Sequence, residues 1–356
     1  ANTFISISQA GLLSTITPNP EERVRLISQA KFFSRFLGEK MPEWIMGFLI
    51  DLINAQKIGL SLKKLFIIMG SATSILSAVM TFWFYMVSKE RVSQSIERPS
   101  VAKGLKAIIN NKPLLLITLS DFLSGFGISQ SRSDYYIDVL GQASLQTLVG
   151  IPAYPILNIS YSFVSPLRRK FTSKKLWIAE DIWTDMCWLI VFGIGSLNKN
   201  FMKRKVMIPV MMIEEFVEMW VYGVRHVIPD ELYNEAMDYC EWKNGYRVEA
   251  MTGAARGLIL KIQNVLMTSV KSFILAKIGY VQGMKIGTQS DTAKWWLFAL
   301  GTGIPIITSA FGILPKFFYP IDKDVRTKMY DELSARRKLV ADEMTAGLQI
   351  SDAVEA

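Results

Sequence analysis

Basic side chains inside one long apolar stretch, residues 250 to 280, are the groups in this chain with the clearest potential for chemistry. The stretch is long enough to cross a bilayer, yet it contains Arg256, Lys261, Lys271 and Lys277. A charge near the centre of a bilayer costs about 3 kcal/mol even on lenient insertion scales. Charges at such positions commonly mark solute or ion pathways, so we expect this segment to face protein or water on one side.

The spacing of the polar residues indicates which side. Gly257, Lys261, Asn264, Thr268 and Lys271 recur at intervals of three or four, which places them on one face of a helix. We predict that Lys261 lines a functional cavity, with Asn264 and Thr268 beside it. Alternatively, basic residues near the ends of the segment extend to the interface, as we expect for Lys277 and largely for Arg256. Lys261 then needs a partner, and the candidate carboxylates are Asp121, Asp134, Glu214 and Glu218.

A charged segment, MDYCEWKNGYRVEA, precedes this stretch and contains a second candidate site. Its charges alternate in sign, so they are able to pair and to hold one end of a helical bundle closed. The alternative is a solvated surface helix, in which each ion pair contributes less than about 1 kcal/mol. The residues concerned are Asp238, Tyr239, Glu241, Trp242, Lys243, Arg247 and Glu249.

This spacing resembles the signature between the tenth and eleventh helices of the glycoside-pentoside-hexuronide:cation symporters, the melibiose permease-like family of the major facilitator superfamily. Cys240 stands where that family usually has glycine. The resemblance implies a helical bundle that moves a glycoside or related sugar by alternating access, with Na⁺ or H⁺ as an undetermined coupling cation. It also implies a role for Lys31, in AKFFSRFLG, at the place of a sugar-contacting arginine; lysine lacks the bidentate fork of arginine.

The stretch TITPNPEER resembles the family's loop between the fourth and fifth helices. We therefore expect the chain to lack most of the first four helices. The resemblance further implies that the family's cation-coordinating carboxylates lie mostly in those early helices.

Composition supports a membrane protein. Hydrophobic residues make up 50% of the chain, although its net charge is +9. The basic residues gather in short loops between apolar segments, which is the positive-inside pattern and makes a nucleic-acid partner unnecessary. Cys187 and Cys240 are far apart, so neither a disulfide framework nor a metal site is indicated.

The fold class that we predict is all-α, a polytopic major facilitator bundle with about eight complete spans. The expected units are the remainder of an N-terminal bundle (1–88), a cytoplasmic linker (89–111), a C-terminal six-helix bundle (112–320) and a cytoplasmic tail (321–356). The expected spans are residues 24–53, 62–88, 112–139, 143–166, 176–197, 205–228, 250–280 and 294–319.

Other spans also carry polar residues at helical spacing, including Asp181 with Asp185 and Glu214 with Glu218. Several polar faces favour a water-accessible central cavity, although each single charge also fits a structural pair or an interfacial position. The predicted substrate-binding residues are Lys31, Lys261, Asn264, Thr268, Asp121 and Glu218.

Transport is the function that these patterns favour, with a small solute such as a sugar and the lipid bilayer as partners. We expect a monomer in the cell membrane, with no cofactor and no bound metal. An enzyme is disfavoured because the single histidine, His226, has no serine or cysteine partner pattern and no P-loop is present. A lysophospholipid carrier, a non-transporting sensor and a membrane enzyme are the alternatives.

Overall fold

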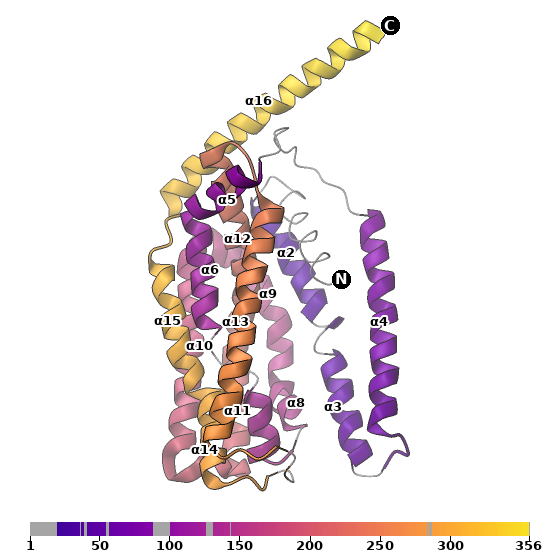
Figure 1. The fold of residues 1–356 in the computed structure, drawn as a ribbon, viewed down its shortest axis with the longest axis vertical. Helices are drawn as coiled ribbons and strands as arrows, with labels where there is room; N and C mark the ends of the chain where they lie inside the picture. Colours follow the sequence, from indigo (N-terminus) through magenta and orange to yellow (C-terminus); the bar gives the residue numbers. More distant parts are fainter. Residues whose placement is uncertain are drawn as a thin grey trace.

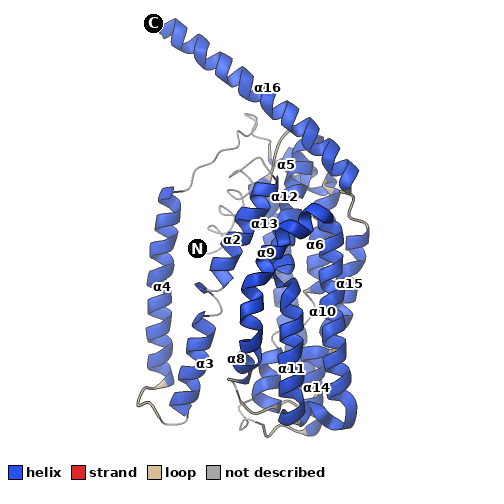
Figure 2. Cartoon of the chain, turned by 180° about the vertical axis from the view of Figure 1, so that it is seen from behind, coloured by secondary structure: helices blue, strands red, loops and turns tan. Residues whose placement is uncertain are grey.

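Helices account for nearly all of the structure, a computed structural model that describes residues 20–35, 37–38, 41–54, 57–87, 100–125, 131–142, 144–282, 284 and 287–355. No β-strand occurs in these ranges (Figure 2), which confirms the predicted all-α class. The long helices are α2 (Pro20–Arg35), α3 (Met41–Asn54), α4 (Leu62–Val87), α6 (Lys112–Ser124), α9 (Tyr154–Lys170), α10 (Ser173–Ser196), α11 (Arg204–Glu218), α12 (Tyr222–Asn244), α13 (Glu249–Lys277), α14 (Asp291–Thr302), α15 (Ile304–Phe317) and α16 (Lys323–Glu355).

Short helical elements join the long ones. They are α5 (Val101–Asn110), α7 (Ser131–Asp134), η2 (Tyr135–Val139), α8 (Leu145–Gly150), η3 (Ile151–Ala153), η4 (Leu197–Met202) and η5 (Met219–Val221).

Local sequence sets several of the helix ends. Ser100, Thr172 and Ser290 each accept a hydrogen bond from the backbone N–H three residues later, at the starts of α5, α10 and α14. Gly245 follows α12 with a φ of 81°, a left-handed conformation that glycine adopts without steric cost. The Gly245 cap fixes the point at which the chain turns from α12 towards α13.

Wherever the structure describes them, the predicted spans coincide with helical segments. Among the described residues, four segments are long and apolar enough to cross a membrane: Leu62–Val87, Leu145–Lys170, Met251–Lys277 and Asp291–Phe317. The other predicted spans coincide, over the described residues, with helices that a short turn divides, as η5 divides α11 from α12, or that carry more acidic and basic residues, as in α10 and α11.

Helices α6 and α9 to α15 form the main bundle, and α2 packs against α9 and α12 on one side of it. In Figure 1, α4 stands apart from this bundle, beyond α3. After Lys63 and Lys64 its side chains are mostly apolar on every side, and nearly all of them are exposed, as suits a helix in contact with lipid. Helix α16 starts against the end of the bundle near α12 and projects beyond it.

Two apolar cores stabilise the bundle. One surrounds α12, where Ile228 and Leu232 pack with Leu157 of α9. The other lies at the opposite end, where Phe298 of α14 packs with Tyr135 and Phe201. Each core joins elements that are far apart in the sequence, so the two together fix the positions of the polar groups described below.

The charged segment with the signature residues is continuous with the helix before it, although the span predicted for residues 205–228 ends at Ile228. After the single turn of η5, helix α12 continues without a break past Pro229 to Asn244. The signature residues up to Lys243 are therefore on the end of a long bundle helix, which holds them in a fixed orientation. Residues 89–99 of the predicted linker lie outside the described ranges, and its later part forms α5.

Candidate functional site

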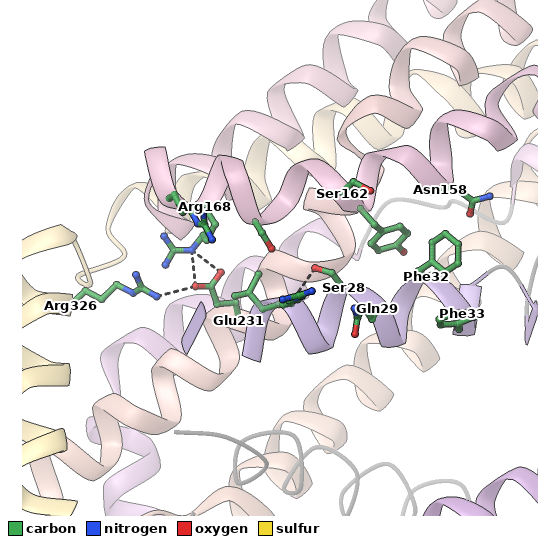
Figure 3. Close-up of a pocket in the computed structure, with 14 residues that line it drawn as sticks. Ser28, Gln29, Phe32, Phe33, Asn158, Ser162, Arg168, Glu231 and Arg326 are labelled. Carbon is green, nitrogen blue, oxygen red and sulfur yellow. Dashed lines mark hydrogen bonds and ion pairs between the residues drawn. The ribbon is translucent and has the colours of Figure 1, made fainter. Parts of the chain in front are cut away.

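A cavity of about 460 Å³ lies between α2 and α9. Figure 3 shows Phe32, Phe33 and Asn158 at one end of it, and Arg168, Glu231 and Arg326 at the other. Its volume falls in the range of small-molecule sites. The cavity therefore joins an aromatic and amide region to a charged region.

Polar side chains line the middle of the cavity. Helix α2 contributes Ser28 and Gln29, and α9 contributes Ser162 and Ser165. The Oδ1 atom of Asn158 is buried and accepts no hydrogen bond from the described residues. A buried acceptor of this kind favours a ligand or water that donates to it.

These residues were missed by the sequence analysis. The signal was present, because Asn158, Ser162 and Ser165 recur at helical intervals within the span predicted for residues 143–166, and Arg169 continues the series just beyond it. Neutral serines and amides stand out less than charges in an apolar segment, so the charged residues of α13 give the stronger signal.

The signature residues form a buried charge cluster centred on Asp238, whose side chain is 0% exposed. Its carboxylate accepts hydrogen bonds from Arg23 of α2 at 3.0 Å, from Arg247 at 2.9 Å and from Arg337 of α16 at 3.1 Å. The hydroxyl of Tyr330 donates a fourth at 3.0 Å. Three different parts of the chain thus meet at one carboxylate, and we call this group the Asp238 cluster.

Electrostatics inside the Asp238 cluster favour ionised groups. Burial alone would raise the pKa of Asp238, but Arg247, Arg23 and Arg337 together hold that pKa well below its usual range. Arg247 also contacts Glu241 at 3.1 Å and Glu249 at 2.7 Å. These contacts confirm that the charges of the signature pair with one another, as their alternating signs predicted.

The aromatic residues of the signature lie beside α16, and Trp242 contacts it directly. Trp242 donates its indole N–H to Glu332 of α16 at 2.6 Å, and the ammonium of Lys243 lies 4.0 Å from the centre of the Trp242 ring. Tyr239 packs edge-on against the same ring. All seven predicted signature residues therefore lie in or beside the Asp238 cluster.

A second charge cluster closes the adjacent end of the cavity. The guanidinium of Arg168 contacts Glu231 at 2.7 Å and Glu235 at 3.1 Å, and Arg326 of α16 contacts Glu235 at 2.7 Å. Burial, followed by the nearby charge of Glu231, raises the pKa of Glu235 to about 7, although both arginines oppose the shift. The sequence analysis did not find this group, because each arginine is 63 to 95 residues away from the carboxylates that it contacts.

The predicted substrate-binding residues do not gather in one place. Lys31 contacts Asp230 of α12 at 2.9 Å and does not line the cavity. Asp121 pairs with Arg256, and Glu218 pairs with Arg225. Those contacts tie neighbouring helices together.

On α13 the face that meets the bundle differs from the predicted stripe. Thr252 and Gln263 are buried, and Lys271, which does belong to the predicted stripe, contacts Asp134 at 2.8 Å. Gln263 donates to the backbone oxygen of Asp121 at 3.0 Å. Lys261, Asn264 and Thr268 are exposed, on another side of the helix. Of the four candidate carboxylates for Lys261, Asp121, Asp134 and Glu218 have other basic partners.

Comparison with known proteins identifies the class to which this fold belongs. The sequence pattern of a family described as MFS/sugar transport protein matches residues 1–323. The chain belongs to this family. Membership confirms the predicted major facilitator fold and the prediction of a transporter rather than an enzyme.

Several proteins with sequences similar to this chain are named as transporters or carriers. The chain is 22% identical over 350 residues to a putative sulfoquinovose importer of Salmonella typhimurium, covering 94% of this chain and 68% of the relative. It is 23% identical to an isoprimeverose transporter of Lactiplantibacillus pentosus, with 93% and 67% covered. It is 20% identical to a glucuronide carrier protein homolog of Escherichia coli, with 95% and 71% covered.

Proposed function

We propose that the protein is a secondary transporter that carries a sugar or glycoside across the membrane by alternating access, in symport with a cation. The observation that carries the proposal is the cavity between α2 and α9. These helices fall in the segments assigned to the N-terminal and C-terminal bundles, and sites between repeats are typical of secondary transporters.

The lining of the cavity suits a sugar. Ser28, Gln29, Asn158 and Ser162 offer donors and acceptors for hydroxyl groups, and the Phe32 ring offers an apolar face to the C–H side of a sugar ring. The rings of Phe32 and Tyr161 pack edge-on with centres 6.4 Å apart, which limits how either ring can turn. A hydrocarbon chain would leave these polar groups without partners, so this lining favours a sugar over a lysophospholipid.

The charged end of the cavity points to an acidic sugar. The lining contains four arginines, Arg25, Arg168, Arg169 and Arg326, and one carboxylate, Glu231. Arg168 and Arg326 contact Glu231 and Glu235, and the arginines still outnumber these two carboxylates. Guanidinium groups bind carboxylates and sulfonates well because they donate two parallel hydrogen bonds. Relatives named for sulfoquinovose and for a glucuronide support this choice, because both solutes are acidic sugars.

The Asp238 cluster fits the role of a gate. Arg23 comes from α2, and Asp238 comes from α12, so their contact joins the two proposed halves. The excess of basic residues in the loops at this end, together with the tail, supports its assignment to the cytoplasmic side. The proposed state is one in which the cytoplasmic end is closed by this cluster.

Solute exchange in proteoliposomes tests this function. The purified protein is assayed for counterflow of sulfoquinovose, isoprimeverose and methyl glucuronide. We expect exchange of at least one of them, with an acidic sugar preferred. Ser162→Leu should lower exchange about tenfold, equivalent to about 1.4 kcal/mol, because an isobutyl group enters the cavity.

Ser334→Leu on the exposed side of α16 is the matched control and should exchange solute at the wild-type rate. The proposal fails if the wild-type protein exchanges none of the three solutes. The assignment of the cavity fails if both variants exchange solute equally well.

A further inference from the structure

Asn158 of α9 lies at the end of the cavity opposite to the arginines. Figure 3 shows it at the same end as Phe32 and Phe33, whereas Arg168 and Arg326 lie at the other end. Its Oδ1 atom is buried and accepts no hydrogen bond from the residues that the structure describes. An acceptor in this position favours a ligand group that donates a hydrogen bond to it.

Packing of the residues around Asn158 holds this part of α9 in place. Leu157 and Tyr161 belong to the apolar core around α12 and are 2% and 5% exposed. The hydroxyl of Ser160 accepts a hydrogen bond from the N–H of Gly223 at 3.0 Å, which joins α9 to α12. A binding group on a helix fixed in this way is already in position before a solute binds, and such preorganisation favours selective binding.

The two ends of the cavity suit different groups of a solute. Guanidinium groups at the charged end bind an anionic group such as a carboxylate or a sulfonate. The unpaired atom of Asn158 is an acceptor, and an ionised acid group has no hydrogen to donate to it. A sugar hydroxyl donates its O–H and therefore fits there. An acidic sugar is thus bound in one orientation, with its acid group at the arginines and a hydroxyl at Asn158.

The length of the cavity fits one sugar ring between these two contacts. On α2, Arg25 and Phe32 both line the cavity and are seven residues apart, which is about 10 Å along the helix axis. On α9, Arg168 follows Asn158 by ten residues, which is about 15 Å. A six-membered ring with its substituents, and a hydrogen bond of about 3 Å at each end, spans a distance of this size.

We propose that Asn158 determines the specificity of the cavity by accepting a hydrogen bond from the C-2 hydroxyl of an acidic sugar. This inference rests on the proposed transport function and deepens it, because it names the hydroxyl that the site requires. In a hexuronide or a 6-sulfonated hexose the acid group is carried on C-5, and C-2 is the ring carbon directly opposite C-5. When the acid group contacts the arginines, the C-2 hydroxyl lies towards Asn158, and the C-4 hydroxyl stays near the charged end.

Equilibrium binding tests this assignment without transport. Isothermal titration calorimetry of the purified protein is carried out with methyl glucuronide and with its 2-deoxy and 4-deoxy analogues. We expect the 2-deoxy analogue to bind at least about tenfold more weakly than methyl glucuronide, because it leaves the buried acceptor of Asn158 without a donor. The 4-deoxy analogue should bind within about threefold of methyl glucuronide, since water can replace its hydroxyl near the arginines.

Variants of Asn158 separate recognition of the hydroxyl from packing. Asn158→Leu removes the acceptor at similar size and should bind methyl glucuronide and its 2-deoxy analogue within about twofold of each other. Asn158→Asp keeps an acceptor and should keep the preference for the C-2 hydroxyl; either variant alone is sufficient if the other does not fold. Asn110→Leu, at an exposed position of α5, is the matched control and should keep the wild-type ratio. A purely structural Asn158 would weaken the binding of all three solutes by one common factor.

The two proposals fail in different ways. Absence of counterflow in the wild-type protein would contradict the transport function, while the binding ratios would still decide the role of Asn158. Three results would overturn that role even where counterflow is present: no binding of methyl glucuronide to the wild-type protein, equal binding of its 2-deoxy analogue, or a wild-type ratio that persists in Asn158→Leu.

Discussion

Asp238 is the residue on which most of the charge network depends. It is fully buried, and three guanidinium groups from α2, the α12–α13 turn and α16 point at its carboxylate. Removal of one member of a buried ion pair costs more than the pair itself contributes, because the remaining charges stay buried without compensation. If the charge of Asp238 were removed, the arginines around it would stay buried without a compensating negative charge.

We predict that Asp238→Asn lowers the free energy of unfolding by about 3 kcal/mol, because it leaves buried arginines without their shared carboxylate. Thermal unfolding of the purified protein measures the change. Asp291→Asn is the control, since its pair with Lys199 at 3.3 Å is exposed and should contribute less than about 1 kcal/mol. Equal melting temperatures for the two variants would show that the cluster is not a stabilising centre.

The wild-type protein and Asp238→Asn should also differ in how their stability depends on pH. The pKa of Asp238 is held below its ordinary value of 3.8, so its contribution is fully present above that value and is lost as the pH falls through the folded-state pKa. The stability difference between the wild-type protein and Asp238→Asn should therefore be constant from neutral pH to about pH 4 and should shrink in stronger acid. A difference that grows on acidification would contradict the assignment of an ionised Asp238.

The role of Lys261 in solute binding remains a prediction from the sequence. Its side chain is exposed on α13, and three of its four candidate carboxylates have other partners. Lys261→Ala is expected to insert normally and to lose solute exchange, since an ammonium in the middle of a span needs water or a solute beside it. Lys277→Ala, in the last turn of α13, is the control for insertion and activity. Wild-type exchange by Lys261→Ala would show that the lysine is only tolerated.

At the scale of single helices, close contact between α9 and α12 holds one wall of the cavity. The N–H of Gly223 donates to the hydroxyl of Ser160 at 3.0 Å, and a Cβ at Gly223 would lie 2.7 Å from the backbone oxygen of Ser160. No larger residue fits here unless one helix moves. The wall therefore depends on glycine at this position.

Gly223→Ala is predicted to lower stability by about 1 to 3 kcal/mol, because the added methyl group forces α9 and α12 apart. Gly193→Ala on α10 is the matched control: a Cβ there meets nothing within 4 Å, so the change should be neutral or stabilise the helix by up to about 1 kcal/mol. Both are measured by thermal unfolding. A stable Gly223→Ala protein would mean that the two helices adjust freely.

The helices themselves were predictable from the sequence because apolar runs of sufficient length define them. Within the signature, Asp238, Glu241, Arg247 and Glu249 were predicted to pair because they are close in sequence. Their partners Arg23 and Arg337 were not, since they are 215 and 99 residues away from Asp238 and no local spacing relates them.

The polar face of α13 shows a second reason why the sequence does not predict every side-chain position. Intervals of three or four can be followed from Gly257 through Lys261, or from Thr252 through Gln263, and the structure buries the second series. In an apolar helix the contrast between faces is weak, so only the packing of α6 against α13 decides which residues turn inward. Charge alone was therefore a poor guide to the faces of this helix.

For the whole molecule, the account requires the two proposed halves to move relative to each other around the cavity. The contact of Arg23 with Asp238 joins α2 to α12, whereas the contacts of Arg247 and Arg337 with Asp238 are confined to the second half and its tail. Loss of the first contact should release the gate while the rest of the Asp238 cluster stays intact.

The distance between spin labels at Glu22 of α2 and Lys328 of α16 tests this account most directly. It is measured by double electron–electron resonance in nanodiscs, for the otherwise wild-type protein and for the same protein with Arg23→Gln. We predict one main short distance in the first and an added population at longer distance in the second, because the closed state loses a buried ion pair. Identical distance distributions, with both proteins folded, would contradict a gate formed by Asp238 and Arg23.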